Sequence, residues 1–467
     1  MSLHFQSVLV SMGVVAAVLL VVRVLSDRAA RLLREDEGAG DGILSRYAKQ
    51  RQREAAHGET QPGARKEIRK EHQLSLRQPA LSAEVQISDG DAAFRALDFG
   101  WRPRAISCNL PGMKLLIFGG TRFVGRHLVE AALARGDQVT LFNRGQTDAD
   151  LFPEVEKLKG DRDGGLDALK GRTWDAVVDT CGFVPRIVRA SAELLRDAVA
   201  HYTFVSSCSV YADPTKPGVD ESGPVGKLED ETVEEITAET YGPLKALCEQ
   251  AVEQALPGHA FHVRAGLIVG PYDYTDRFSY WPRRIGQGGE VLAPGKPEAP
   301  VQFVDGRDLA EWILRMAEGR KAGVFNATGP NPPVTLGELL EACRLVAGSD
   351  ARFTWVDSAF LVERKVAPYS ELPLWVPEET QGFNAFNCRK AWAAGLSFRP
   401  LDETIRDTWK WDATRSPEQR MAGARAMIPG PLGGDRERDL LDEWLSHVPN
   451  GGQSASISSP GSGRDAT

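Results

Sequence analysis

The sequence has few cysteines, and their spacing argues against the common cysteine-based sites. Its six cysteines lie far apart, with no Cys-x-x-Cys pair and no histidine at metal-ligand spacing. This pattern is typical of free thiols in a reducing compartment. We therefore predict free thiols and no metal site. The cysteines are Cys108, Cys181, Cys208, Cys248, Cys343 and Cys388.

An excess of positive charge is also absent. The chain has 56 Lys and Arg residues against 64 Asp and Glu residues, a net charge of -8 and a pI near 5.7. A nucleic-acid-binding surface needs basic residues gathered on one face. The composition therefore argues against nucleic acid and favours a small-molecule substrate. With 467 residues, 42% of them hydrophobic, the chain exceeds one typical domain and can bury a large core.

No apolar run reaches the usual length of a membrane-spanning helix. The longest, residues 8–22, is interrupted only by Ser11 and Gly13 and is at the short end for a span. Basic residues follow it, which would keep the rest of the chain in the cytoplasm. We predict a membrane anchor in residues 1–25, with the tether through residues 8–25 and a cytoplasmic catalytic domain. A signal-like segment, or an extension outside the functional protein, is the alternative.

The rest of the chain divides by its pattern. Residues 26–112 show no sustained period and are predicted to be a flexible linker, and the Gly, Ser and Pro-rich residues 450–467 a disordered tail. Strand-like and helix-like segments alternate from Met113 onward. This alternation predicts an α/β fold, a Rossmann-type doubly wound parallel sheet in residues 113–449, with a smaller C-terminal substrate lobe mainly in residues 270–449. Strands are expected at 114–118, 138–142, 176–179, 202–205 and 261–264, and helices at 124–135, 185–199, 241–256, 308–317 and 336–346.

A glycine turn joins the first expected strand to the first helix. Glycines let the backbone approach a pyrophosphate, and a helix N-terminus favours negative charge. The usual middle glycine is replaced by Arg122, so an ordinary strand-to-helix turn is the alternative. The predicted cofactor-binding residues are Gly119, Gly120, Thr121, Arg122, Phe123, Val124 and Gly125.

The end of the second strand bears on the choice of cofactor. An acidic residue there would bind the ribose of NAD, whereas an arginine suits the 2'-phosphate of NADP. Asn143 and Arg144 occupy this position, so the cofactor is expected to be NADP or NAD, with NADP preferred. Asp161, beyond the next strand, is expected near the adenine edge. The alternatives are a solvent-exposed Arg144 and an Asp161 that caps the following helix.

A Ser, Tyr and Lys set supplies candidate catalytic residues. Ser207 ends a strand at the carboxyl edge of the sheet, where ligands bind in open α/β folds, and can donate to a substrate oxygen. Tyr241 and Lys245 are spaced i, i+4 on one helix face, and Pro243 is compatible if the helix starts close to Tyr241. A nearby ammonium and a nicotinamide cation are expected to lower the pKa of the phenol. The alternatives are locally bonded serines, a packed Tyr241 and a solvated Lys245.

Together these motifs resemble the extended short-chain dehydrogenase/reductases of the NAD-dependent epimerase/dehydratase family, from Met113 to about Ser446. The glycine turn is most similar to the subset that includes chloroplast stem-loop binding proteins, in which Arg also stands at the middle position. The resemblance implies Ser207, Tyr241 and Lys245 as the catalytic triad. It also implies that Lys245 holds the nicotinamide ribose.

Two departures from the family pattern limit the substrate. Family dehydratases carry Asp-Glu after the catalytic Ser or Thr, where this chain has Cys208-Ser209; this argues against sugar 4,6-dehydration. Nucleotide-sugar enzymes commonly place Arg-Asp before the aromatic residue of a later strand, where this chain has Val301-Gln302. Arg283 and Arg284 either replace that charge or form a solvated surface pair.

The predicted function is that of an NAD(P)-dependent oxidoreductase or epimerase, which transfers a hydride at a carbonyl or carbinol carbon of a small, sugar-like substrate. An NADP preference favours a net reductase over an epimerase. A homodimer is a further expectation. The alternative is a non-catalytic Rossmann-fold protein that binds RNA or a protein partner.

Overall fold

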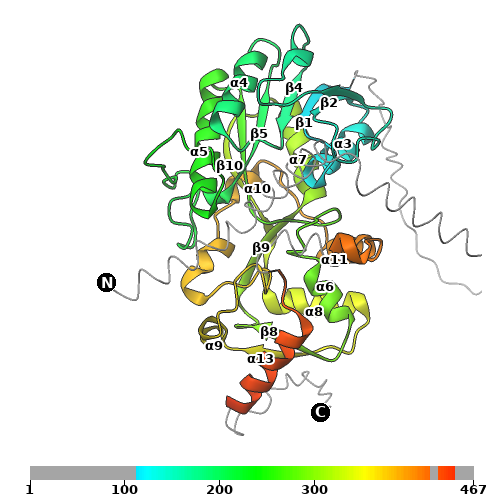
Figure 1. Cartoon of the computed structure of the whole chain (residues 1–467), viewed down its shortest axis with the longest axis vertical. Helices are drawn as coiled ribbons and strands as arrows, with labels where there is room; N and C mark the ends of the chain where they lie inside the picture. The colour runs from blue at the N-terminus through cyan, green and yellow to red at the C-terminus, as the bar shows by residue number, and fades with distance from the viewer. Residues whose placement is uncertain (1–111, 421–429, 448–467) are drawn as a thin grey trace, which may run out of the picture. The chain divides into compact units, whose positions relative to one another are not determined.

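The computed structural model of the chain describes residues 112–420 and 430–447 (Figure 1). The predicted membrane anchor, the linker up to residue 111 and the tail from residue 450 lie outside the described residues. Within the described ranges, no helix is long and apolar enough to cross a membrane. The same ranges contain no group of three or more His, Cys, Asp or Glu side chains that could hold a metal ion.

A parallel sheet of seven strands forms the first lobe. Its strand order is β10-β6-β5-β4-β1-β2-β3, and every pairing is parallel. The order reverses between β1 and β4, which makes a crevice for ligands at the carboxyl ends of these strands. The strands are β1 (Lys114–Phe118), β2 (Gln138–Asn143), β3 (Glu156–Lys159), β4 (Ala176–Asp179), β5 (Tyr202–Ser207), β6 (Ala260–Ala265) and β10 (Gly323–Ala327).

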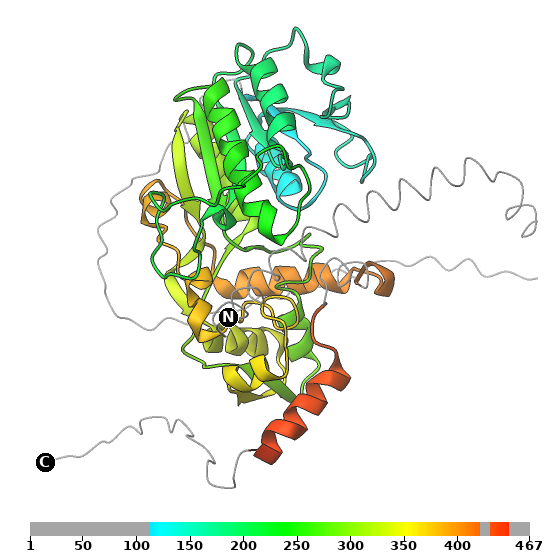
Figure 2. The ribbon, with the colours of Figure 1, turned by 60° about the vertical axis from the view of Figure 1, so that its left-hand side comes forward.

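Helices cover both faces of this sheet (Figure 2). Helices α3 (Phe123–Ala134) and α7 (Gly306–Glu318) pack together with Leu115 and Ile117 of β1. The alternate residues Leu116 and Phe118 pack with α4 (Pro185–Leu195) and α5 (Ala238–Ala255). Because successive strand residues point to opposite faces, an apolar run such as β1 needs cover on both sides. The predicted Rossmann-type, doubly wound sheet is confirmed.

A second lobe has its own core and two small sheets. One sheet has the order β11-β9-β7 and the other pairs β12 with β8, and a separate apolar cluster that includes Trp281 and Leu339 lies between these strands and their helices. Its strands are β7 (Ile268–Val269), β8 (Glu290–Pro294), β9 (Pro300–Asp305), β11 (Gly329–Thr335) and β12 (Arg352–Val356). Its helices are α6 (Tyr280–Gly286), α8 (Leu336–Ala347), α9 (Ser358–Glu363), η3 (Glu378–Asn384), α11 (Leu401–Ala413) and α13 (Gly434–His447).

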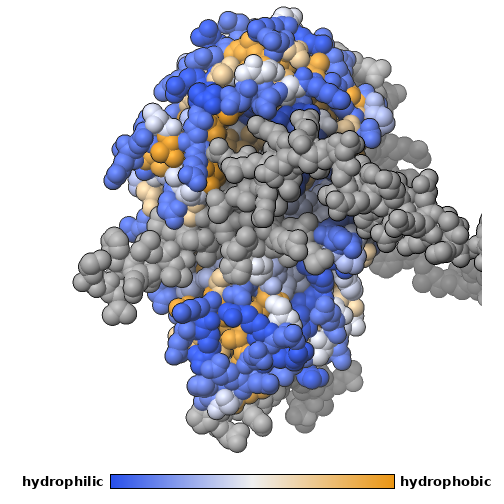
Figure 3. Space-filling view, in the orientation of Figure 1, coloured by the Kyte–Doolittle hydropathy of each residue, from blue (hydrophilic) through white to orange (hydrophobic). Residues whose placement is uncertain are grey.

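The chain alternates between the two lobes. After β9 it returns to the Rossmann sheet as α7 and β10, enters the second lobe again as β11, and returns once more as α10 (Arg389–Ala393), which packs against β10. The segment predicted as the substrate lobe therefore also completes the seven-stranded sheet. On the face shown in Figure 3, the described residues are largely hydrophilic and the apolar ones form small groups.

Candidate active site

A cavity of about 810 Å³ lies at the carboxyl edge of the seven-stranded sheet. It is lined by residues of both lobes, and all the site residues predicted from the sequence lie on its wall. These are residues 119–125, Asn143, Arg144, Asp161, Ser207, Tyr241 and Lys245.

The glycine turn is shaped for a phosphate. Gly119 and Gly120 have φ values of +96° and +92°, in the left-handed region that favours glycine. A Cβ on Gly125 would approach the Gly120 amide nitrogen to 2.8 Å, so only glycine keeps the turn this tight. Helix α3 starts here with no side-chain cap and no acidic residue in its first turn. Its amides and positive dipole end therefore fit the pyrophosphate of a dinucleotide.

Two cations lie at the ends of β2 and β3, next to this turn. Arg144 is exposed and lines the cavity. Lys159, at the end of β3, lies beside Gly145, where an added Cβ would meet its Nζ atom at 3.6 Å. The sequence prediction missed Lys159 because only the pairing of β3 with β2 brings it here.

Asn143 and Asp161 also lie at this edge of the sheet, at the end of β2 and just after β3. Asn143 donates from Nδ2 to the Gly119 carbonyl at 2.9 Å and accepts from the Gly145 amide at 2.9 Å. Asp161 accepts from the Asp163 amide at 2.9 Å. The next helical turn, η1 (Asp167–Leu169), begins after Leu166, so Asp161 does not cap it.

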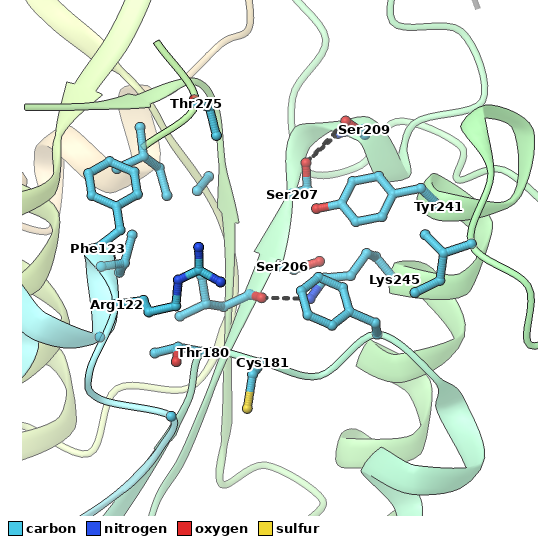
Figure 4. A pocket seen from close by; sticks show the side chains of 18 of the residues that line it. Arg122, Phe123, Thr180, Cys181, Ser206, Ser207, Ser209, Tyr241, Lys245 and Thr275 are labelled. Carbon is cyan, nitrogen blue, oxygen red and sulfur yellow. Dashed lines mark hydrogen bonds between the residues drawn. The ribbon is translucent and has the colours of Figure 1, made fainter. Parts of the chain in front are cut away.

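Ser207 ends β5 and faces the catalytic side of the cavity. Its hydroxyl accepts from the Ser209 amide at 3.1 Å, which fixes the start of the short helix η2 (Cys208–Val210). Figure 4 shows the Tyr241 hydroxyl beside Ser207, whose own hydroxyl donates to the Ser209 side chain at 3.1 Å. Cys208, in place of the acidic residue of family dehydratases, is buried and its thiol donates to the Arg264 carbonyl at 3.2 Å.

Helix α5 places Tyr241 and Lys245 on one side of the cavity. It begins at Ala238 with a capping box of Thr237 and Thr240, three residues before the expected start near Tyr241, so Pro243 lies inside the helix. Gly242 lets the helix approach η2 closely, since a Cβ there would clash with the Ser209 carbonyl oxygen. Because residue 242 has no side chain, α5 can lie close enough to η2 to place the Tyr241 phenol beside Ser207.

The predicted lowering of the Tyr241 pKa is wrong for the chain itself. Burial raises the pKa of Tyr241 above its ordinary value, and a hydrogen bond with Ser207 and the charge of Arg277 offset this only in part. Tyr241 is therefore a phenol at neutral pH, ready to donate a proton. A bound nicotinamide cation would have to supply the additional charge that favours the phenolate.

Lys245 is held by two backbone carbonyls. The residue is 2% exposed, and its ammonium donates to the Gly182 carbonyl at 2.7 Å and the Val205 carbonyl at 2.8 Å. Burial lowers the pKa of Lys245 below its ordinary value, whereas Cys248 and Asp179 act in the opposite direction. An ammonium has three donors, so one remains for a ligand in the cavity.

The sequence prediction missed two buried features on the side of the cavity expected to bind the cofactor: the contacts of Asp179 and the hydroxyl of Ser206. Arg162 donates to Asp179 at 2.7 Å, and Tyr202 donates to the same carboxylate at 3.0 Å, which fixes the end of β4. Ser206 lines the cavity with a buried hydroxyl that has no hydrogen-bond partner among the described residues. An unpartnered buried hydroxyl fits a site that a polar ligand completes.

The second lobe supplies the opposite wall of the cavity. Thr275 and Arg277 come from the loop after β7, and Tyr369 and Phe386 from later segments. In β9, Gln302 stands where nucleotide-sugar enzymes commonly have Asp, and here it has a structural role. Its side chain donates to the Phe386 carbonyl at 3.0 Å and accepts from the Phe386 amide at 2.8 Å. Phe386 also stacks on Tyr211, with ring centroids 5.8 Å apart.

Neither expectation for Arg283 and Arg284 is correct. Arg283 pairs with Asp276 at 3.3 Å and Asp412 at 3.2 Å, and Arg284 with Glu437 at 2.6 Å. Among the described residues, neither arginine belongs to the cavity wall. Both are used inside the second lobe and are mostly shielded from solvent.

The strand order and the glycine turn at its switch point define a Rossmann-fold nucleotide-binding protein. Residues 115–327 match the NAD dependent epimerase/dehydratase family, and this part of the chain belongs to that family.

The chain is 27% identical over 253 residues to the chloroplast stem-loop binding protein of 41 kDa b of Arabidopsis thaliana. This alignment covers 50% of the chain and 63% of the relative, less than two thirds of its length. Among solved structures, the UDP-Glc/GlcNAc 4-epimerase of Campylobacter jejuni matches with a TM-score of 0.50 and 16% identity, over 65% of this chain and 100% of that one. A putative epimerase of Burkholderia cenocepacia matches with a TM-score of 0.47 and 21% identity, over 67% and 99%. At 16% identity, the Campylobacter match shows the fold alone.

Proposed function

We propose that this chain is an NAD(P)-dependent oxidoreductase or epimerase that acts at a carbinol or carbonyl carbon of a small molecule. The observation that carries the proposal is the convergence of Ser207, Tyr241 and Lys245 on the cavity that the glycine turn opens into. The bound nicotinamide would accept or deliver the hydride. The chain's own residues position the substrate and move the proton.

Each residue has a role that follows from its contacts. Ser207 is oriented by Ser209 and donates to the substrate oxygen, which polarises the carbonyl. Tyr241 gives its proton to that oxygen during reduction and takes it back during oxidation. Lys245, anchored by its two carbonyls, presents its remaining donor to the nicotinamide ribose.

Substitution of Tyr241 tests this proposal. With the full chain, coenzyme binding is measured by fluorescence, and hydride transfer by deuterium uptake from labelled NAD(P)H into metabolites of a cell extract. An epimerase returns the hydride to its own substrate, so a second measurement follows the transient reduction of the protein-bound coenzyme. We expect Tyr241→Phe to bind coenzyme but to lose about 10²- to 10⁴-fold in transfer, the usual contribution of a general acid or base.

Tyr280→Phe is the matched control. The Tyr280 hydroxyl is buried without a hydrogen-bond partner among the described residues, so its removal breaks no hydrogen bond. Hydride transfer that survives Tyr241→Phe would exclude the assigned role, and a chain that binds neither NAD nor NADP would exclude the function.

We propose NADP as the preferred coenzyme. The exposed Arg144 and the neighbouring Lys159 support this, since both cations lie where the glycine turn directs the adenine ribose.

RNA recognition is a second candidate, favoured by the name of the Arabidopsis relative, a stem-loop binding protein. The net charge of -8 and the Ser, Tyr and Lys set weigh against it. A salt-sensitive mobility shift with stem-loop RNA, in a chain that binds no coenzyme, would favour it over the enzyme.

A further inference from the structure

Arg277 differs from the other buried or partly buried arginines, which pair with carboxylates. Examples are Arg162 with Asp179, Arg264 with Glu249, Arg307 with Asp305 and Arg399 with Asp308. Arg277 is partly buried and donates from Nε to the Thr275 hydroxyl at 2.9 Å. Among the described residues, no carboxylate forms an ion pair with it. Its two terminal nitrogens are therefore available to a ligand.

Asp273, the acidic residue on whose pKa Arg277 acts, is held by Thr275. Asp273 accepts from the Thr275 amide at 3.0 Å and from the Thr275 hydroxyl at 2.5 Å. Its other oxygen is buried without a hydrogen-bond partner among the described residues. Burial raises the pKa of Asp273 above its ordinary value, although Arg277 acts in the opposite direction. Asp273 is therefore bonded to Thr275 and forms no ion pair with Arg277 among the described residues.

The coenzyme accounts for other cations on the wall but not for Arg277. Arg122 and Arg144 lie at the glycine turn and at the end of β2, where phosphates are expected. Arg277 lies instead at the catalytic end, where its charge lowers the pKa of Tyr241 and Tyr369 against the effect of burial. An anion bound there would lie near the reacting oxygen.

The adjoining wall is mostly apolar. Pro368, Val376, Pro377, Phe383 and Phe386 line it. The Tyr369 hydroxyl donates to Asn384, and Gln302 is bonded to Phe386, so these polar groups are already paired. A wall of this kind binds the apolar body of a ligand.

We propose that Arg277 binds an anionic group of the substrate, a carboxylate or a phosphate monoester, and that the remainder of the substrate is apolar. This inference rests on the proposed function, because it assigns the substrate class of the same site. It makes Arg277 the residue that selects an anion through charge-assisted hydrogen bonds.

Three small phenyl compounds, two anions and one neutral ester, test the proposal. Phenylacetate, phenyl phosphate and the neutral methyl phenylacetate are titrated by saturation-transfer NMR against the full chain saturated with coenzyme. We expect at least one anion to bind wild type about 10-fold or more tightly than the ester, and Arg277→Gln to weaken that anion about 10- to 100-fold without affecting the ester. Arg277→Lys should keep part of the preference. The anion that binds more tightly identifies the group.

Arg352→Gln is the matched control, because Arg352 is exposed on β12. Equal affinity for anion and ester, an anion preference that survives in Arg277→Gln, or coenzyme binding without binding of either anion would each overturn the proposal. Anion binding through Arg277 in a chain that binds no coenzyme would leave the anion site intact and remove the proposed function.

Discussion

The two halves of the cavity are built in different ways. The coenzyme half uses short, continuous segments, among them the glycine turn of residues 119–125 and residues 142–147. The substrate half collects single residues from segments between Tyr274 and Phe386. The first half depends on backbone shape, whereas the second depends on side chains brought together by tertiary contacts. Backbone changes should therefore affect coenzyme binding, and side-chain changes should affect substrate selection.

The largest expected effect comes from the backbone of the coenzyme half. In Gly125→Ala the new methyl would lie 2.8 Å from the Gly120 nitrogen, and the turn would have to open. We expect the coenzyme dissociation constant to rise about 10- to 100-fold, the equivalent of a typical overpacking cost. Gly434→Ala is the control, because a Cβ there meets nothing within 4 Å. Unchanged coenzyme affinity in Gly125→Ala would break the comparison.

Gln302 is the corresponding test in the substrate half. Gln302→Ala removes both hydrogen bonds to the Phe386 backbone. We expect the free energy of unfolding in urea to fall by about 1 to 3 kcal/mol, while coenzyme affinity stays the same. Gln287→Ala, at an exposed position after α6, should change neither quantity. A loss of coenzyme affinity in Gln302→Ala would show that the two halves are not independent.

Charge at the adenine end should have a smaller effect. We expect the double variant Arg144→Gln, Lys159→Gln to weaken NADP about 3- to 10-fold relative to NAD, because exposed cations are partly screened by solvent. Arg189→Gln, which removes an exposed charge from α4, is the control. An unchanged ratio of NADP to NAD affinity would show that these cations do not contact a 2'-phosphate.

The smallest effect concerns the titration of Tyr241. Its raised pKa favours the phenol, so Tyr241 should contribute no phenolate absorbance below about pH 10, the ordinary tyrosine value. The measurement is the phenolate absorbance of wild type minus that of Tyr241→Phe over a pH titration, both without coenzyme. Arg277→Gln removes a charge that lowers this pKa, and should move the onset to still higher pH. A Tyr241 midpoint well below pH 10 would contradict the burial argument.

The sequence predicted the coenzyme half better than the substrate half, for physical reasons. The glycine turn and the apolar strands depend on neighbouring residues, so their pattern is visible in the sequence. The spacing of Tyr241 and Lys245 correctly predicted that they share a helix. It did not predict the burial that raises the pKa of the Tyr241 phenol. Arg283 lies near Arg277 in the sequence, yet its role depends on Asp412, which lies far along the chain.

Because the chain alternates between the lobes, recombination cannot exchange the substrate-binding residues without also exchanging a strand of the seven-stranded sheet. A recombination event after β6 would exchange Arg277, Gln302 and Phe386 as one block. The same block carries β10, whose residues from Gly323 to Ala327 pair with β6. A hybrid would therefore need a new fit along the β6 and β10 pairing before it could display a new specificity. Within this scaffold, point substitution is the easier route to a different substrate.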